Sequence, residues 1–205
     1  MDGNNRWAKK KSINKFNAYK KGSEKLIKLS SFIFNKYGVE NISAFALSSN
    51  NLKRSNYIIN TIKKVLDTSL SELENYKINF NIRIIGNFNF LDKETINKIL
   101  KINNNSLFNK NLYIFLNYGG REDIHQASIK MKKSNHFPDN LLTKNIPDPD
   151  ILIRSGGYSR LSNFMLYQIS FTELFFIKKL WPDITNKDIV KIIEKYHLID
   201  RKFGK

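Results

Sequence analysis

The chain has 205 residues, no cysteine and a formal net charge of +17 at pH 7. Its length favours a single domain over residues 1–205, and the hydrophobic fraction of 41% is enough for a sizeable core. The lack of cysteine excludes disulfides, zinc–thiolate sites and cysteine nucleophiles. We find no apolar run long enough to span a bilayer and no signal-peptide pattern, so we expect a cytoplasmic protein.

The basic charge has two interpretations. It is typical of proteins that meet nucleic acid, an anionic membrane surface or phosphorylated substrates, but a bias toward AT-rich codons gives the same lysine excess. The lysines are spread along the chain instead of forming one stripe, and no RNA-binding aromatic motif or zinc finger is present. A nucleic-acid-binding role therefore rests on charge alone, and we expect no nucleic-acid partner.

Strand-like and helical segments alternate along the chain. The apolar periodicity predicts helices at 23–37, 55–76, 92–102, 120–133 and 186–200, with helix-forming sequence also from 162. It predicts strands at 41–47, 80–86, 112–118 and 150–154, with a further apolar stretch at 174–177. This alternation predicts an α/β fold with a mainly parallel central sheet flanked by helices.

The first ten residues, MDGNNRWAKK, combine turn chemistry with the start of a helix. The free N–H groups at a helix start favour an anion, and Arg6 adds a bidentate donor for phosphate. The segment therefore has the chemistry of a phosphate site. The alternative is a frayed, solvated terminus.

Three polar clusters follow predicted strands, with the sequences SSNNLKR, NYGGRED and RSGGYSR. In parallel α/β sheets, ligands bind at the carboxyl ends of the strands, so we expect the clusters to meet there. In the third cluster, Arg154, Arg160 and Ser162 could converge on a diphosphate, with Ser162 as a helix N-cap. The alternative is that Arg154 pairs with Asp148 or Asp150 and that the glycines only form a turn.

Glu173 lies in the apolar segment QISFTELFF. A carboxylate in such a segment is costly to bury without a partner. One interpretation is a Mg²⁺ ligand with Asp2 as a second carboxylate, since this ion takes few protein oxygens. The other is an outward-facing side chain on an amphipathic segment.

Taken together, these motifs resemble the cis-prenyltransferase family, and within it the bacterial undecaprenyl-diphosphate synthases. The resemblance rests on MDGNNRWAKK, SSNNLKR, NYGGRED and above all on DILIRSGGYSRLSNFMLYQISFTELFF followed by LWPDIT. It covers the chain from the first residue to about residue 203. It implies an α/β sheet domain with a hydrophobic tunnel, usually a homodimer.

The resemblance also implies an activity and its residues. The enzyme would add isopentenyl diphosphate to farnesyl diphosphate with cis geometry and Mg²⁺, making undecaprenyl diphosphate, a lipid carrier for cell-wall polymers. Contact with a membrane surface is then plausible. By motif position, the implied roles are metal binding and catalysis for Asp2, assistance in proton removal for Asn51, and completion of the metal site for Glu173. The allylic diphosphate would lie against Gly3, Asn4, Arg6 and Trp7, with Ser48, Ser49 and Arg54 flanking Asn51, and isopentenyl diphosphate would bind Arg154, Arg160 and Ser162.

The chain departs from the family pattern at several positions. Asn5 replaces a Gly, Tyr158 replaces a Glu, and Ser159 replaces a His that helps with metal. Further departures are Lys15, Tyr19, Asn50 and Leu52. The strand that the family carries before MDGN is missing, which predicts either a start codon further upstream or a degenerate gene. The alternative to an enzyme is therefore a non-catalytic homologue or partner subunit.

Overall fold

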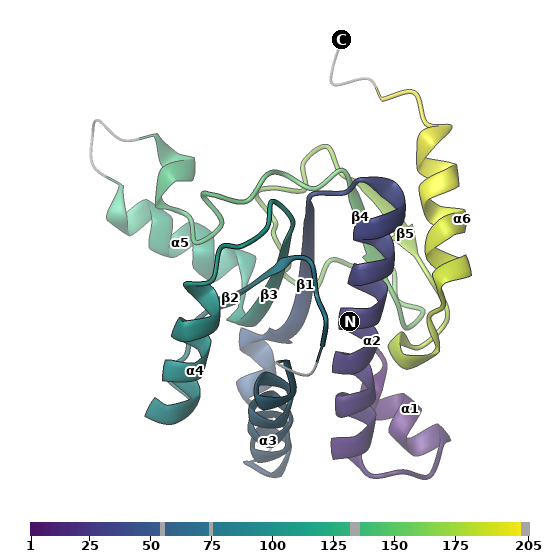
Figure 1. The fold of residues 1–205 in the computed structure, drawn as a ribbon. Helices are drawn as coiled ribbons and strands as arrows, with labels where there is room; N and C mark the ends of the chain where they lie inside the picture. Colours follow the sequence, from purple (N-terminus) through teal and green to yellow (C-terminus); the bar gives the residue numbers. More distant parts are fainter. Residues whose placement is uncertain (54–55, 74–75, 132–135, 202–205) are drawn as a thin grey trace.

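In the computed structural model, which describes residues 1–53, 56–73, 76–131 and 136–201, helices and strands alternate along the chain (Figure 1). The helices are α1 (Asn4–Lys10), α2 (Lys15–Tyr37), α3 (Asn56–Glu72), α4 (Lys93–Asn103), α5 (Gly120–Lys130) and α6 (Asn186–His197). The strands are β1 (Asn41–Ser48), β2 (Asn81–Gly86), β3 (Asn111–Tyr118), β4 (Ile151–Arg154) and β5 (Glu173–Phe176). Among the described residues, no helix has both the length and the apolar character needed to cross a bilayer.

The strands form two parallel sheets. In one, β3 lies between β1 and β2; in the other, β4 pairs with β5. The prediction of a parallel α/β fold with flanking helices is confirmed, although we expected one sheet. The start of the chain lies between the two sheets. The Met1 amino group donates to Phe45 O of β1 (3.1 Å), and the Asp2 amide donates to Ser155 Oγ, directly after β4 (3.1 Å).

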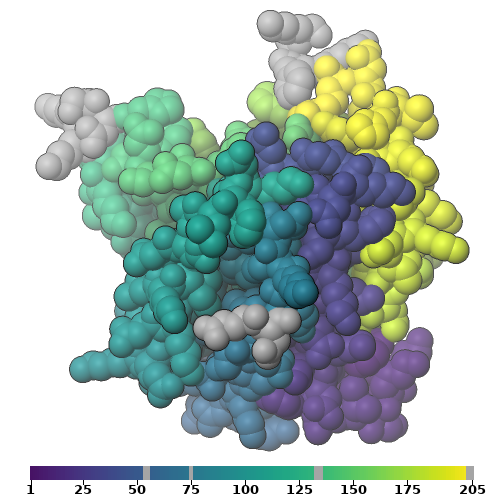
Figure 2. Space-filling model, viewed as in Figure 1, coloured from purple at the N-terminus to yellow at the C-terminus, as the bar shows by residue number. Residues whose placement is uncertain are grey.

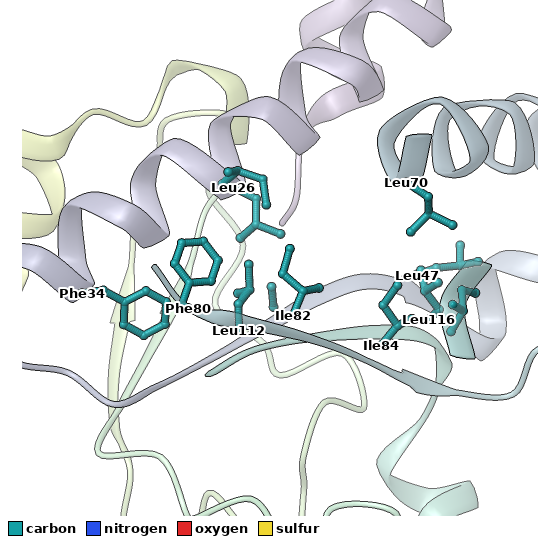
Figure 3. Packing of buried hydrophobic residues seen from close by; sticks show 12 residues of the cluster. Leu26, Phe34, Leu47, Leu70, Phe80, Ile82, Ile84, Leu112 and Leu116 are labelled. Carbon is teal, nitrogen blue, oxygen red and sulfur yellow. The ribbon is translucent and has the colours of Figure 1, made fainter. Parts of the chain in front are cut away.

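The main core lies between the three-stranded sheet and the helices on one of its faces. In Figure 3, Leu26 and Phe34 of α2 and Leu70 of α3 point toward a row of strand side chains. Figure 2 shows α2, α3 and α4 next to one another on this side of the molecule. The opposite face of the sheet packs on the segment after α5. There, Phe115 of β3 and Met165 of that segment belong to a second buried cluster. The sheet is therefore buried on both faces, as parallel sheets usually are.

Local sequence chemistry explains several of the helix boundaries. The side chain of Asn14 accepts from the Asn17 amide and so caps α2, which begins eight residues before the predicted start. Gly38 ends α2 in a left-handed conformation (φ 64°), as its type predicts. Asp92 caps α4 through the Thr95 amide.

The helix predicted from Ser162 is wrong. This segment forms turns, with positive φ at Ser162 (52°), Asn163 (67°) and Met165 (45°). A left-handed backbone cannot continue a right-handed helix, and here tertiary contacts hold it. The carbonyl of Asn163 accepts from the Gly120 amide (2.8 Å), and its side-chain oxygen accepts from the Arg121 amide (2.8 Å).

Candidate active site

The carboxylate of Asp2 joins two arginines that are far apart in sequence. Its Oδ2 accepts from Arg154 Nη2 (2.9 Å), and its Oδ1 accepts from Arg6 Nη2 (3.2 Å). Arg6 also donates to Gly156 O (2.8 Å). The alternative pairing of Arg154 with Asp148 or Asp150 is not what the structure shows, since Asp150 pairs with Arg201 instead.

The backbone around Asp2 is fixed as firmly as its side chain. Asp2 O accepts from Ser155 Oγ (3.0 Å) and from the Trp181 amide (2.9 Å). Gly156 lies against this segment, because a Cβ added there would be 2.6 Å from Arg6 Nη2 and 3.1 Å from Asp2 Cγ. A side chain at position 156 would therefore displace the ion pair.

Arg154 also reaches the loop that follows β4. Its Nη1 donates to Ser162 Oγ (2.6 Å) and to the carbonyl of Arg160. Ser162 thus contacts an arginine of the cluster, although it is not a helix cap. The ring of Tyr158 lies near the guanidinium carbons of Arg160 (4.1 Å from the ring centroid), Arg6 (4.8 Å) and Arg154 (5.8 Å).

A second group of polar contacts connects this loop to the carboxyl end of β1. Glu122, in α5, accepts from Ser49 Oγ (3.1 Å) and from Asn163 Nδ2 (2.8 Å). Ser48 ends β1, and Asn51 lies in the short 3₁₀ helix η1 (Ser49–Lys53) that follows it. Arg54, the remaining predicted residue of this cluster, is outside the described residues.

The residues that follow Asp2 contact the neighbouring elements. Gly3 precedes α1 with a positive φ of 109°, and a Cβ there would meet Leu180 at 2.9 Å. Asn4 faces α2, since its Oδ1 would be 2.5 Å from a Cβ at Gly22. The indole of Trp7 donates to Asp183 (2.7 Å) in η4 (Trp181–Asp183), so it fastens α1 to that turn. Roles for these three residues in diphosphate binding remain predictions.

Glu173 lies apart from the arginine cluster. It begins β5 in register with Ile151, three residues before Arg154 along β4, which corresponds to roughly 10 Å along the strand. Within the described part of the chain, no group of three or more His, Cys, Asp or Glu side chains could hold a metal ion. Mg²⁺ often uses one or two carboxylates together with substrate phosphates, so Asp2 fits such an ion, while Glu173 of the same chain does not reach it.

An apolar cavity of about 140 Å³ lies next to the charged cluster, beneath α2 and α3. It lies beside Met1 and Asn4, is partly open to solvent, and is lined mainly by aliphatic side chains of the helices and the sheet. Ala46 of β1 is the unpaired residue of a bulge between Phe45 and Leu47, and it also lines this cavity. The site thus offers a charged part and an apolar part side by side.

Sequence reasoning missed three residues that shape the site: Tyr158, Ser155 and Glu122. Tyr158 was noted as a departure from a family pattern, and Glu122 belongs to the NYGGRED cluster, but neither carried a role. In the same cluster, Asp123 is buried and accepts from the Leu142 amide (2.8 Å) and the Tyr118 hydroxyl (3.1 Å). Burial raises the pKa of Asp123. The NYGGRED motif therefore contains Glu122, which contacts residues of the site, and Asp123, which supports the fold.

The chain is similar over its length to known proteins of one family. A family model described as "Putative undecaprenyl diphosphate synthase" matches residues 1–204. The tritrans,polycis-undecaprenyl-diphosphate synthase (geranylgeranyl-diphosphate specific) of Pyrobaculum aerophilum is 35% identical, over all of this chain and 93% of its own. An isoprenyl transferase of Helicobacter pylori is 34% identical, over all of this chain and 94% of its own.

The fold is also similar to solved structures of diphosphate synthases. Lavandulyl diphosphate synthase from Lavandula x intermedia, in complex with dimethylallyl diphosphate, superposes with a TM-score of 0.85 at 27% identity, covering 100% of this chain and 95% of that one. A probable undecaprenyl diphosphate synthase from Campylobacter jejuni gives 0.79 at 29% identity, covering 90% and 92%.

The ion pairs of Asp2 predict a pH dependence of stability. Partial burial alone raises the pKa of Asp2, but the hydrogen bond from Arg154 and the charge of Arg6 outweigh it, so the pKa lies below the ordinary aspartate value of 3.8. Stability from these pairs is present above that value and lost as the pH falls through the lower folded-state pKa. We therefore expect the free energy of unfolding of the wild type, minus that of Asp2→Asn, to decrease between about pH 5 and pH 2.

Urea unfolding followed by tryptophan fluorescence measures this difference. The control is Asp139→Asn, which removes a carboxylate that is 73% exposed and contacts no arginine among the described residues. A wild-type advantage over Asp2→Asn that does not change with pH would show that Asp2 is not ion-paired in solution.

Proposed function

We propose that this chain, which belongs to the cis-prenyltransferase family, catalyses the addition of isopentenyl diphosphate to farnesyl diphosphate with cis geometry. The observation that carries the proposal is the convergence of Asp2, Arg6, Arg154 and Arg160 beside an apolar cavity. Three guanidinium groups against one carboxylate favour an anion with several charges, such as a diphosphate. The neighbouring cavity suits the hydrocarbon part of the same molecule.

The product that we propose is undecaprenyl diphosphate, a lipid carrier for cell-wall polymers. Support comes from the description of the matching family model. The relatives carry different specificities in their names, including one for geranylgeranyl diphosphate, so the choice of farnesyl diphosphate is part of the proposal. The net charge of +17 is compatible with peripheral contact between the protein and an anionic membrane surface.

The proposed chemistry begins with cleavage of the allylic C–O bond, which leaves the electron pair on the departing diphosphate. A new C–C bond forms to isopentenyl diphosphate, and a C–H bond beside the new cation then breaks, its electron pair forming the new double bond. The released diphosphate would accept the proton, with Asn51 assisting. Arg6 would stabilise the departing diphosphate, and Arg154, Arg160 and Ser162 would hold isopentenyl diphosphate. A bound Mg²⁺ would supply further positive charge at the leaving diphosphate, with Asp2 as its protein ligand.

The hydrocarbon chain would grow into the apolar cavity. Its volume of about 140 Å³ is close to that of a cavity that holds one benzene molecule, about 150 Å³. A long polyprenyl chain would exceed this volume, so we propose that the elements around the cavity, including α2 and α3, move apart as the chain grows. Such a movement would form the predicted tunnel.

A second copy of this chain is the proposed partner. Large apolar side chains are exposed on β5 and on the turn before it, and soluble proteins rarely leave neighbouring apolar side chains uncovered. These are Phe171 (62% exposed), Leu174 (43%) and Phe176 (41%), of which Leu174 and Phe176 lie on the same face of β5. A homodimer that covers this surface is the arrangement that we propose.

Asp2→Ala tests the proposed activity. The wild type should incorporate labelled isopentenyl diphosphate into an extractable lipid when given farnesyl diphosphate and Mg²⁺. We expect Asp2→Ala to reduce kcat by at least about a hundredfold, because it removes a group that organises the charge-stabilising donors. Chromatography of the dephosphorylated product would give the chain length.

Asp139→Ala is the matched control, since its side chain is 73% exposed and far in sequence from the cluster. We expect it to keep wild-type activity. If the wild type formed no product with farnesyl, geranylgeranyl or dimethylallyl diphosphate, the chain would instead be a non-catalytic homologue. The separation of Glu173 from Asp2 within one chain is the observation that favours this second candidate.

Ala46→Phe tests whether the product grows into the cavity. The larger ring would fill space beneath α2 and α3, so we expect products of one or two additions to replace the long product. Ala46→Ser, which adds one small atom, is the control and should leave the product length unchanged. An unchanged length in Ala46→Phe would place the hydrocarbon chain elsewhere.

Leu174→Asp tests the dimer. A charge on this surface should be tolerated by the folded monomer, because Leu174 is already 43% exposed, but not inside an apolar interface. Sedimentation should show a dimer for the wild type and a monomer for the variant. Leu107→Asp, at a leucine that is 74% exposed outside this surface, should remain dimeric. A monomeric wild type would contradict the proposal.

A further inference from the structure

The aromatic ring of Tyr158 lies against all three guanidinium groups of the site. Its centroid is 4.1 Å from Arg160 Cζ, 4.8 Å from Arg6 Cζ and 5.8 Å from Arg154 Cζ. These arginines come from α1, from the end of β4 and from the loop after it. One side chain thus contacts cations that three different segments supply.

The three guanidinium groups repel one another, and Asp2 offsets only part of this repulsion. Asp2 pairs with Arg6 and Arg154. Among the described residues, the guanidinium of Arg160 has neither an ion pair nor a hydrogen bond, and it lies over the Tyr158 ring. Of these contacts, only the ring holds this side chain beside the other two guanidinium groups.

An aromatic ring attracts cations in a different way from a carboxylate. The negative face of the ring stabilises a nearby guanidinium, but it leaves the positive charge in place and occupies none of the N–H donors in the guanidinium plane. A cluster held by a ring therefore remains able to bind an anion. A carboxylate in the same place would compete with that anion.

The local backbone explains how the ring reaches the cluster. Gly156 and Gly157 have positive φ values of 92° and 80°, which reverse the chain directly after Ser155. The Gly156 amide donates to Lys179 O (2.7 Å), and the Gly157 amide donates to Ile177 O (3.0 Å). The turn is thus fixed by backbone hydrogen bonds before the chain arrives at Tyr158.

We propose that Tyr158 is a positioning residue that gathers Arg6, Arg154 and Arg160 around its ring, so that the anion site is formed before the diphosphate binds. The identity of the anion rests on the proposed function. Groups that are already in place lose less conformational freedom on binding, so this arrangement raises affinity. The ring acts through the arginines and takes no part in bond making.

The test measures binding of inorganic pyrophosphate without Mg²⁺, by isothermal titration calorimetry. We expect Tyr158→Leu, which removes the ring, to weaken binding about tenfold. Tyr158→Phe, which keeps the ring and removes the hydroxyl, should stay within about twofold of the wild type. Tyr167→Leu is the matched control, because Tyr167 is 42% exposed like Tyr158 and its recorded ring contact is with Phe137.

Steady-state kinetics supply a readout that a purely structural role would not move. Tyr158→Leu should raise KM for isopentenyl diphosphate about tenfold and leave kcat within about threefold, because binding to the ground state and to the transition state is weakened alike. Thermal unfolding should be unchanged in all three variants, since both tyrosines are partly exposed.

The results distinguish the role of Tyr158 from the existence of the diphosphate site. Equal pyrophosphate affinity in Tyr158→Leu and the wild type would overturn the inference and leave the enzyme assignment intact. Equal losses in Tyr158→Leu and Tyr158→Phe would also overturn it, because the hydroxyl would then be responsible. A wild type that binds no pyrophosphate would overturn the diphosphate site itself, and the inference with it.

Discussion

The site depends on the pairing of one carboxylate with two guanidinium groups. Asp2 is 152 residues from Arg154 in the chain, and its two oxygens bring Arg154 and Arg6 to the same point. The backbone of Asp2 is held at the same place by Ser155 and Trp181. The first helix, the end of β4 and the turn before α6 are therefore all fixed around one residue, through its side chain and its backbone. Charge-assisted hydrogen bonds of this kind have the geometric specificity that such a junction requires.

The first residues also separate the polar part of the site from its apolar part. Asp2 and Arg6 belong to the charged cluster, whereas Met1 and Asn4 line the cavity beneath α2 and α3. A few residues at the start of the chain thus contribute to both surfaces. A substrate with a diphosphate at one end and a hydrocarbon at the other is matched by this division, because each end meets an environment of its own polarity.

The sequence predicted the alternating architecture and the strand positions. It offered convergence of Arg154, Arg160 and Ser162 as one of two interpretations of that segment, and only the family resemblance joined Asp2 to them. Hydrophobic periodicity and helix capping depend only on residues near one another in the sequence. The predicted start of α4 at Asp92 and end of α2 at Gly38 are therefore confirmed. The helix expected at Ser162 failed because long-range hydrogen bonds hold the next residue, Asn163, in a left-handed conformation. No local pattern reveals such contacts. The predicted metal site of Asp2 and Glu173 also depends on a long-range feature, the register of β4 and β5. That register places Glu173 beside Ile151, at the end of the sheet opposite to Arg154.

The pairing of Asp2 with the arginines also bears on how a reaction cycle could end. In the absence of ligand, the carboxylate already occupies donors of Arg6 and Arg154, so an incoming anion must displace it from them. When that anion departs, the Asp2 carboxylate can pair again with Arg6 and Arg154. If the anion is the diphosphate of the proposed reaction, this competition would weaken retention of the released diphosphate and would return the protein to its unliganded arrangement.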